Sequence, residues 1–323
     1  MSEIVSVDIG GTHARFAIAE VGGGRVVRLD EEVTLKTAEH ASLETAWEEF
    51  GARLGRALPP AAAIAIAGPV QGEVLKLTNN PWVIRPAWIP KKLGAERYAL
   101  VNDFGAVAHA VAQLDDANFT HLCGPELPLP EEGVISIVGP GTGLGVAQLL
   151  RRDGRYHVIE TEGGHIDFAP IDALEDRILA HLRTRYRRVS VERVASGQGL
   201  ANIYDALAAI EHRDVRYRDE KELWAAAMAC EDSLAAAAFD RFCLALGAVA
   251  GDIALAQGAQ AVVIAGGLGL RLASLLPKSG FRDRFIAKGR FERRMDDMPV
   301  KLITHPQPGL FGAAAAFAAR FGE

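Results

Sequence analysis

The sequence predicts a two-lobed α/β protein in which each lobe opens with a hairpin closed by a glycine turn. The first observation is a β-branched run, a glycine pair and a second alternating run, which read from Ser6 to Glu20 as strand, glycine turn and strand. The second is a weak copy of this pattern from Ser136 to Leu150. The third is the length of 323 residues, which favours two lobes over one.

The glycines of the first hairpin allow the backbone to approach an anion closely. Without a Cβ at Gly10 and Gly11, successive N–H groups can point at one anion, and Thr12 adds a hydroxyl donor. A dinucleotide-binding fingerprint would open a helix, whereas here a second strand follows. We expect phosphate as the anion, with Asp8 holding a hydrated cation or orienting a donor. An ordinary hairpin turn after a strand-end aspartate is the alternative.

The second hairpin repeats the first at a constant offset of 130 residues. At this offset, identical residues coincide at three positions after the first strand: Gly11 and Gly141, Thr12 and Thr142, and Ala17 and Ala147. Two such turns could hold a polyphosphate from both sides. A chance recurrence of the Gly-Thr pair is the alternative.

Composition excludes several classes of protein. The 35 basic and 41 acidic residues give a net charge of −6 without a basic block, so we expect no nucleic-acid partner. Three cysteines without a C-x-x-C spacing indicate neither a disulfide framework nor a zinc site. The chain enters a strand at Ile4 without a signal peptide, and no apolar run reaches membrane-spanning length. We therefore expect a cytoplasmic protein with no membrane partner.

The rest of the first lobe reads as alternating strands and helices. The expected elements are a third strand at Val26–Lys36, a helix capped by Ser42 and ended by Pro59-Pro60, a buried strand at Ala61–Ala67, a loop at Leu77–Trp82, a strand at Tyr98–Val101 and a helix at Gly105–Leu114. Asn102-Asp103 follow a strand at its carboxyl end, where open α/β folds place their chemistry. Taken alone, Asp103 is better explained as a helix N-cap.

The second lobe begins near the proline-rich segment Gly124–Gly133. The expected elements after its hairpin are the glycine-softened run Glu162–Asp167, a helix at Glu175–Tyr186, Glu192 ahead of a glycine-rich turn, a helix at Asp232–Ala256, a strand at Ala261–Ala265, a helix at Leu270–Leu276, a strand at Val300–Thr304 and a last helix, Pro308–Phe321, that packs on the first lobe. A lone histidine such as His165 is usually structural. Gly266-Gly267, between a strand and a helix, resemble a nucleotide site.

In this order, the motifs resemble those of a bacterial ATP-dependent glucokinase of the hexokinase and actin-like ATPase superfamily. The motifs VDIGGTHARFA, IAGPVQGEVLKLTNNPW, VNDFGAVAHA, GPGTGLGVA, EGGHIDFAP, VERVASGQGL, IAGG and PGLFGAAA cover essentially the whole chain. The resemblance implies a two-lobed, ribonuclease H-like fold in which each lobe is a mixed sheet flanked by helices. The implied lobes are 1–113 with 304–323, and 114–303, with the active-site cleft between them. The branch with a cysteine-rich zinc motif is disfavoured, because this chain lacks such cysteines.

The resemblance also implies roles, position by position. Asp103 matches the catalytic base. The residues matching the sugar-binding set are Asn79, Asn102, Asp103, Glu162, His165 and Glu192. The residues matching the ATP-binding set are Asp8, Gly10, Gly11 and Thr12 in the first turn, Gly141, Thr142 and Gly143 in the second, and Gly266 and Gly267 on the adenosine side. ATP and Mg²⁺ are the implied cofactors, with Asp8 holding the metal through water, and the family often forms homodimers.

The residue types agree with this chemistry independently. Carboxylates, an amide and an imidazole are the side chains that bind a ring of hydroxyls, and phosphoryl transfer needs little more than a clamp and one base. A kinase for another hexose or an amino sugar stays open. Sugar-responsive repressors need a DNA-binding segment ahead of the first turn, where only about seven residues precede Asp8. Filament-forming relatives have no reason to combine EGGH with Asp103.

Overall fold

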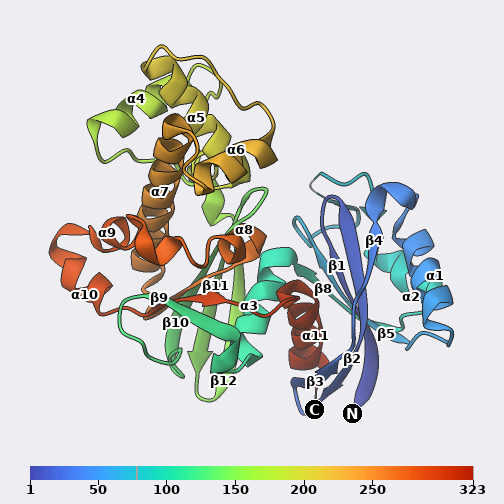
Figure 1. Ribbon diagram of the computed structural model, residues 1–323. Helices are drawn as coiled ribbons and strands as arrows, with labels where there is room; N and C mark the ends of the chain where they lie inside the picture. Colours follow the sequence, from blue (N-terminus) through green and yellow to red (C-terminus); the bar gives the residue numbers. More distant parts are fainter. Residues whose placement is uncertain (78, 323) are drawn as a thin grey trace. The chain divides into compact units, whose positions relative to one another are not determined.

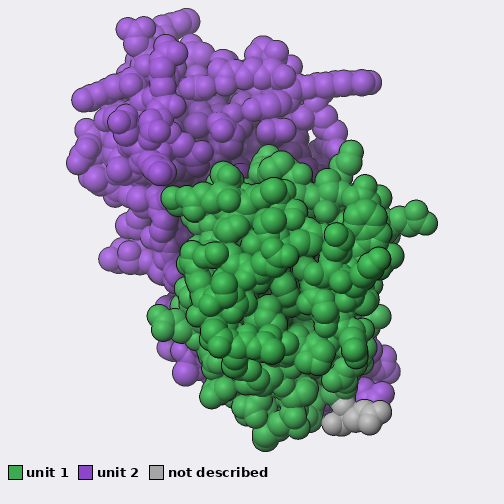
Figure 2. All heavy atoms as spheres, turned by 90° about the vertical axis from the view of Figure 1, so that its right-hand side faces the viewer, with its two compact units in different colours: residues 1–115, 305–323 green, residues 116–304 purple. Residues whose placement is uncertain are grey.

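The computed structural model describes residues 1–77 and 79–322. Thr78, in the loop expected at Leu77–Trp82, and Glu323 lie outside the described residues. The chain forms two compact units, unit 1 from residues 1–115 with 305–323 and unit 2 from residues 116–304 (Figure 2). The lobe bounds expected from the sequence, and the cleft between the lobes, stay a prediction.

Unit 1 is built on a mixed sheet with the strand order β3-β2-β1-β5-β8, to which β4 adds by pairing with β2. Its elements in chain order are β1 (Ser2–Ile9), β2 (His13–Gly22), β3 (Arg25–Leu29), β4 (Val33–Lys36), α1 (Leu43–Leu54), β5 (Ala61–Ile66), β6 (Leu75–Lys76), β7 (Val83–Ile84), α2 (Ile89–Leu93), β8 (Arg97–Asn102), α3 (Asp103–Gln113) and α11 (Pro308–Phe321). Strands β6 and β7 form a small sheet of their own.

Helices cover both faces of the unit 1 sheet. On one face, Trp47 and Phe50 of α1 are buried with Phe16 of β2. On the other, alanines of α3 and α11 pack with Phe317 against the strands. Figure 1 shows α11 beside α3 and the sheet. The two helices meet so closely that a Cβ at Gly312 would overlap the carbonyl oxygen of Ala106. Small residues therefore set the spacing of this layer.

Unit 2 is built on a second mixed sheet, with the strand order β12-β11-β10-β13-β14-β9. Its elements are β9 (Phe119–Cys123), β10 (Gly133–Pro140), β11 (Leu144–Arg152), β12 (Arg155–Thr161), α4 (Ala173–Leu182), α5 (Gly197–Ile210), α6 (Glu220–Met228), α7 (Ser233–Gln257), β13 (Ala261–Ile264), α8 (Gly266–Arg271), α9 (Phe281–Ile286), α10 (Glu292–Asp296) and β14 (Val300–Ile303). Two 3₁₀ turns matter below, η4 (Gly163–His165) and η5 (Val191–Arg193).

The two sheets share a plan. In each, the first strand of a hairpin pairs antiparallel with the second and parallel with a later strand, β1 with β5 and β10 with β13. A further parallel strand follows, β8 in unit 1 and β14 in unit 2. The predicted repeat of the glycine hairpin therefore has a counterpart in the backbone.

The repeat keeps its register only as far as the turn. Ile9 pairs with Ala14, whereas Gly139, which the offset places on Ile9, pairs with Gly145, so the second hairpin has one more residue between equivalent positions. The match of Ala17 on Ala147 is therefore wrong, because Ala17 faces Ser6 while Ala147 faces Ile137. A fixed offset cannot describe two hairpins whose turns differ in length.

Several expected bounds are wrong at helix ends and in one strand. The single strand expected at Val26–Lys36 is two, β3 and β4, which pair with different halves of β2. Helix α1 has the expected Ser42 cap but ends at Leu54, because Gly55, with a φ of 69°, stops it before Pro59-Pro60. Helix α4 ends at Leu182 rather than Tyr186.

Two glycine-rich segments start helices instead of turns. Gly197 opens α5 because the side chain of Ser196 accepts from the N–H of Gly199. Helix α8 begins at Gly266, not at the expected Leu270, and ends at Arg271. The sequence predicts glycine turns at both places, whereas Gly197 and Gly266 are the first residues of helices.

One helix contradicts the expectation about apolar runs. Helix α7 has 25 residues and contains an 18-residue stretch with a mean hydropathy of 1.5, so by length and composition it could span a membrane. Most of that stretch, 61%, is buried within unit 2, where Phe242 and Leu246 are fully covered. Burial of this kind is what the core helix of a globular unit requires.

Candidate functional site

A partly buried acid lies just before the first glycine turn. The N–H of Gly10 donates to the carbonyl oxygen of His13 at 2.9 Å and closes the turn. Asp8, two residues earlier, has a side chain only 19% exposed, 3.5 Å from the guanidinium of Arg15. Burial raises the pKa of the Asp8 carboxyl, and the positive charge of Arg15 opposes that rise. A Cβ at Gly309, in the first turn of α11, would meet this carboxylate at 2.6 Å.

Asp8 fits the chemistry of a magnesium site that is completed by a substrate. Mg²⁺ is commonly bound through one or two carboxylates, waters and substrate phosphates rather than by an all-protein cage. Among the described residues, no group of three or more His, Cys, Asp or Glu side chains could hold a metal ion. A single carboxylate acting through water is the arrangement that unit 1 offers.

Neutral groups brace the first turn. The side-chain amide of Asn80 donates to the carbonyl oxygen of Gly10 at 2.9 Å, and the Thr37 hydroxyl donates to that of Gly11 at 3.0 Å. Asn79 adopts a left-handed φ of 56°, and its carbonyl oxygen would lie 3.2 Å from a Cβ at Gly11. The loop that carries Asn79 is thus packed on the turn. Its contact with sugar stays a prediction.

Asn102 and Asp103 stand at the same end of the unit 1 sheet as the first turn. Ile9 pairs with Ile66, and Ile66 pairs with Asn102, so β1, β5 and β8 end together. This edge, the carboxyl end of parallel strands, is where open α/β sheets bind ligands.

The N-cap of α3 is Asn102, which corrects the interpretation of Asp103 as the cap. The side-chain oxygen of Asn102 accepts from the N–H groups of Phe104 and Gly105, at 2.9 and 3.1 Å, and its amide donates to Gly68. Asp103 is the first helical residue, and its Oδ1 accepts from the N–H of Phe104 at 2.9 Å. The start of a helix favours a carboxylate in its ionised form.

The second glycine turn is braced by a helix start. The N–H of Gly141 donates to the carbonyl oxygen of Gly143 at 2.9 Å. The carbonyl oxygen of Gly141 in turn accepts from the N–H of Gly197, at the start of α5, at 2.7 Å. A Cβ at Gly141 would meet no heavy atom of the described residues within 4 Å. The face of the turn at Gly141 and the exposed Thr142 is therefore open.

The turn at Gly266 lies against the second hairpin. Gly266 has a left-handed φ of 83°, and a Cβ there would meet the carbonyl oxygen of Pro140 at 2.7 Å. Both conformation and space therefore require glycine. Strands β10 and β13 end side by side, since Val138 pairs with Ile264, so Gly266 and Gly267 follow the same sheet edge as Gly141.

The segment from Glu162 to His165 is packed on β11. A Cβ at Gly163 would meet Val146 at 2.9 Å, and one at Gly164 would overlap the carbonyl oxygen of Leu144. The side chains of Glu162 and His165 lie 3.8 Å apart and are mostly exposed. The two glycines thus press the turn onto the strand and leave its polar side chains free to meet a ligand.

Two features that the sequence did not reveal hold this segment to Glu192. The Arg188 guanidinium donates to the carboxylate of Asp167 and to the carbonyl oxygen of His165. The backbone of Ile166 accepts from the N–H of Val191 at 2.9 Å. As a result η4 and η5 pack together.

Unit 2 therefore brings together the residues assigned to sugar and those assigned to phosphate. The carboxylate of Glu192 accepts from the N–H of Leu144 at 3.1 Å, directly after the second turn. Sequence spacing could not reveal this contact, because the partners lie on different elements.

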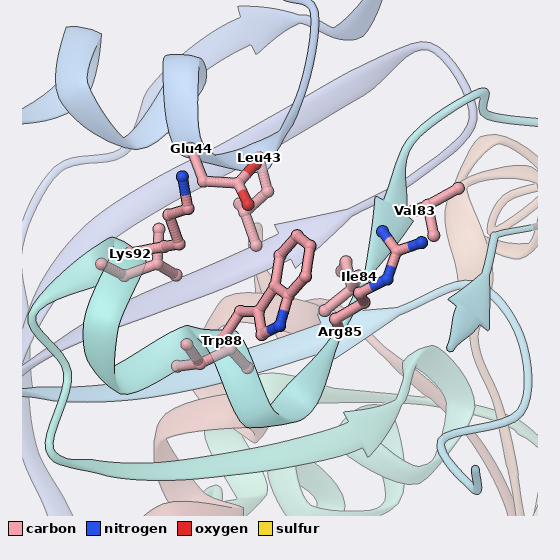
Figure 3. Close-up of a pocket in the computed structure, with 9 residues that line it drawn as sticks. Leu43, Glu44, Val83, Ile84, Arg85, Trp88 and Lys92 are labelled. Atoms are coloured by element: carbon pink, nitrogen blue, oxygen red, sulfur yellow. The ribbon is translucent and has the colours of Figure 1, made fainter. Parts of the chain in front are cut away.

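A further pocket of unit 1 lies away from all these residues. Figure 3 shows the ring of Trp88 in its wall, with the guanidinium of Arg85 4.7 Å from the ring centre. The lining residues are Leu43, Glu44, Val83, Ile84, Arg85, Trp88, Ile89, Lys92 and Leu93. The predicted site residues are all described, and none of them lines this pocket.

Comparison with known proteins extends over the whole chain. The sequence model of the glucokinase family matches residues 5–320. A glucokinase of Zymomonas mobilis is 67% identical over 321 residues, 99% of each chain. A glucokinase of Caulobacter vibrioides is 41% identical over 313 residues, 96% of this chain and 93% of the relative.

Solved structures agree. The crystal structure of a glucokinase from an Antarctic psychrotroph has a TM-score of 0.86 at 33% identity and covers 98% of this chain and 99% of that one. A ROK family glucokinase of Streptomyces griseus, in complex with glucose and AMPPNP, has a TM-score of 0.62 at 20% identity and covers 97% and 98% of the two chains. Two mixed sheets flanked by helices are the actin-like ATPase fold of these proteins, so the predicted fold class is confirmed. Since the family model and these relatives extend over nearly all of the sequence, the chain belongs to the glucokinase family.

Proposed function

We propose that the chain is a glucokinase that transfers the γ-phosphoryl group of ATP to the 6-hydroxyl of glucose, giving glucose 6-phosphate and ADP. The observation that carries the proposal is the match of the glucokinase family model to residues 5–320. The relative with 67% identity over 99% of each chain bears the same name.

Asp103 is the general base of this reaction. Its carboxylate takes the proton of the 6-hydroxyl as that oxygen bonds to the γ-phosphorus, and the bond from the phosphorus to the bridging oxygen of ADP breaks. The position of Asp103 in the first turn of α3 supports this role, because the positive end of the helix dipole attracts a carboxylate. Asn102, which caps the same helix, fixes where it begins.

The sugar hydroxyls are bound by amide, carboxylate and imidazole groups. Unit 2 supplies Glu162, His165 and Glu192, which η4 and η5 hold in neighbouring turns. Unit 1 supplies Asn102 and Asn79. These side chains offer both donors and acceptors, as a ring of hydroxyls requires.

Backbone groups of the two glycine turns bind the phosphates. The first turn supplies Gly10, Gly11 and Thr12, and the second supplies Gly141, Thr142 and Gly143, with Gly266 and Gly267 toward the adenosine. A Cβ at Gly141 or Gly267 would meet no heavy atom of the described residues within 4 Å, so the backbone there is open to an anion. Asp8 would hold Mg²⁺ through water, and the bound ion would neutralise the phosphate charge.

A substrate panel tests the proposal. Purified protein is assayed with magnesium-ATP and glucose, mannose, fructose, glucosamine or N-acetylglucosamine, and kcat/KM is compared. We expect the highest value for glucose. A higher value for another sugar would support the alternative, a kinase for a different hexose or an amino sugar, and turnover of none would refute both.

Two further properties belong to the same proposal. We expect the enzyme in the cytoplasm, and we expect a homodimer, as in other members of the family. Light scattering at several protein concentrations would measure the mass, and a mass of 34.5 kDa at all of them would contradict the dimer.

A further inference from the structure

The carboxylate of Glu192 is in contact with the second glycine turn. Its Oε2 accepts from the N–H of Leu144 at 3.1 Å, the first residue after Gly143. A Cβ added at Gly143 would overlap this same oxygen. Gly143 does not adopt a positive φ, so a side chain there would displace the Glu192 carboxylate rather than strain the backbone. The carboxylate occupies the volume that a side chain at position 143 would need.

Leu144 is also the residue on which the sugar-binding segment rests. The carbonyl oxygen of Leu144 faces Gly164 so closely that a Cβ at Gly164 would overlap it. The turn that carries Glu192 is tied to the same segment, because the N–H of Val191 donates to the carbonyl oxygen of Ile166. Leu144, Gly164 and Glu192 thus form one contiguous packing unit between the phosphate turn and the sugar residues.

We infer that Glu192 is shared between the sugar site and the phosphate turn of unit 2, so that the position of each depends on the other. The inference rests on the proposed function, which makes Glu192 a sugar ligand. A carboxylate has two oxygens, and a backbone N–H that engages one leaves the other to accept from a sugar hydroxyl. Glu192 is in this way a sugar ligand and a positioning residue for residues 141–143.

A shared residue couples two ligands reciprocally. A change that displaces Glu192 from the turn must weaken the sugar, and loss of Glu192 must weaken the nucleotide even when sugar is absent. Glu162 provides the contrast, because its described side-chain contact is with His165 rather than with the turn. Substitution of a sugar ligand that does not contact the turn would change the affinity for glucose alone.

The first experiment changes the phosphate turn and measures the sugar. Glucose binding to Gly143→Ala and Gly141→Ala is measured by calorimetry without nucleotide. We expect glucose affinity to fall on the order of 10-fold in Gly143→Ala, because the new Cβ pushes the carboxylate away. We expect wild-type glucose affinity in Gly141→Ala, the matched control, because its Cβ meets no heavy atom of the described residues within 4 Å.

The second experiment changes the sugar residues and measures the nucleotide. AMPPNP binding with magnesium and without sugar is compared in Glu192→Ala, Glu192→Gln and Glu162→Ala. We expect several-fold weaker binding in Glu192→Ala, recovery in Glu192→Gln, whose amide oxygen can still accept from the Leu144 N–H, and no change in Glu162→Ala. A role of Glu192 restricted to the sugar would leave all three equal to wild type.

The outcomes separate this inference from the proposed function. Wild-type protein that binds no glucose would refute the proposed function. Wild-type protein that binds and phosphorylates glucose, with a folded Gly143→Ala variant of unchanged glucose affinity, would overturn the shared role. Thermal unfolding establishes that each variant is folded, and if Gly143→Ala is not, the AMPPNP comparison decides.

Discussion

The turn after β1 is held by neutral side chains, whereas the turn after β10 is held by a carboxylate and a helix start. Asn80 and Thr37 donate to carbonyl oxygens of the first turn. Glu192 accepts from the N–H that follows the second turn, and Gly197 donates to Gly141. The two hairpins therefore share a backbone plan but not their support.

The strands that lead into the turns differ as well. Asp8 lies on β1 at the position that the repeat offset assigns to Val138 on β10, and Val138 is fully buried. Unit 1 thus carries a partly buried acid beside its turn, together with Asp103 on the same sheet edge. Unit 2 carries the carboxylates and imidazole assigned to the sugar. Two copies of one backbone plan thus carry different side chains, and variants in each unit should separate the proposed base from the proposed sugar ligands of unit 2.

The largest expected effect is in unit 1, at Asp103. In Asp103→Asn the amide can still hydrogen-bond the 6-hydroxyl but cannot accept its proton, so we expect kcat to fall by about 10²–10⁴ with little change in glucose affinity. Steady-state rates beside calorimetric glucose affinities test this. Turnover close to wild type would remove Asp103 as the base.

A variant in unit 2 should instead change glucose affinity. In His165→Ala we expect glucose affinity to fall on the order of 10- to 100-fold, because the polar groups of sugar and site lose a partner. Calorimetry measures it, and His157→Ala, an exposed histidine on β12, is the control. A purely structural His165 would instead lower the unfolding temperature and leave glucose affinity intact.

A bulky side chain in either turn should weaken nucleotide binding, but its effect on stability should differ between the two turns. Gly141→Val and Gly11→Val should each weaken AMPPNP more than glucose, because a side chain enters the space where backbone meets phosphate. We expect Gly141→Val to keep its unfolding temperature and Gly11→Val to lose some, because a Cβ at Gly11 lies within 3.3 Å of Asn79. Unfolding temperatures and AMPPNP titrations test both, and unchanged nucleotide affinity in the folded variants would contradict the paired turns.

The smallest effect concerns the acid that only the first hairpin carries. Burial raises the pKa of Asp8 above its ordinary 3.8, so the folded protein holds that proton more tightly than the unfolded chain does. Its contribution to stability is fully present below that ordinary value and is lost as the pH rises through the raised pKa. The Asp8→Asn variant should therefore have a slightly higher unfolding temperature than wild type at pH 7. It should also bind AMPPNP less tightly in the presence of magnesium.

Thermal unfolding between pH 3 and pH 8 checks the sign of this effect. The exposed Asp30, changed to Asn, provides the comparison within unit 1. A variant at Asp8 that is less stable than wild type at pH 7 would mean that Arg15 outweighs burial.

Local pattern predicted the hairpins and most strands, because alternating residues and glycine pairs act over a few positions. The prediction failed where contacts with residues distant in the sequence determine the local structure. Gly197 starts a helix because Ser196 caps it and Gly141 accepts from its N–H. The short edge strands β9 and β12 were not predicted, since only their neighbours in the sheet define them.

The candidate site divides in the same way. Family motifs supplied residue types such as Glu192 and Asn79, and the structure adds contacts that no motif contains. Asn80 rather than Asn79 donates to the first turn, and Glu192 accepts from Leu144. Which side chain of a polar pair makes a contact depends on backbone geometry, as with the left-handed φ of Asn79.

The packing of α11 on α3 determines the order in which the chain can fold during synthesis. Unit 2 lies between residues 115 and 305, so the ribosome makes all of it before residues 308–321 emerge. Until then, the alanine layer over Ala106 has no partner, and Ser6 lacks the carbonyl oxygen of Leu310 that its hydroxyl binds at 2.7 Å. Unit 2 can complete its core first, whereas unit 1 must close a loop as long as unit 2. The helix that carries Asp103 therefore reaches its final packing only after the unit 2 residues assigned to sugar binding have been synthesised.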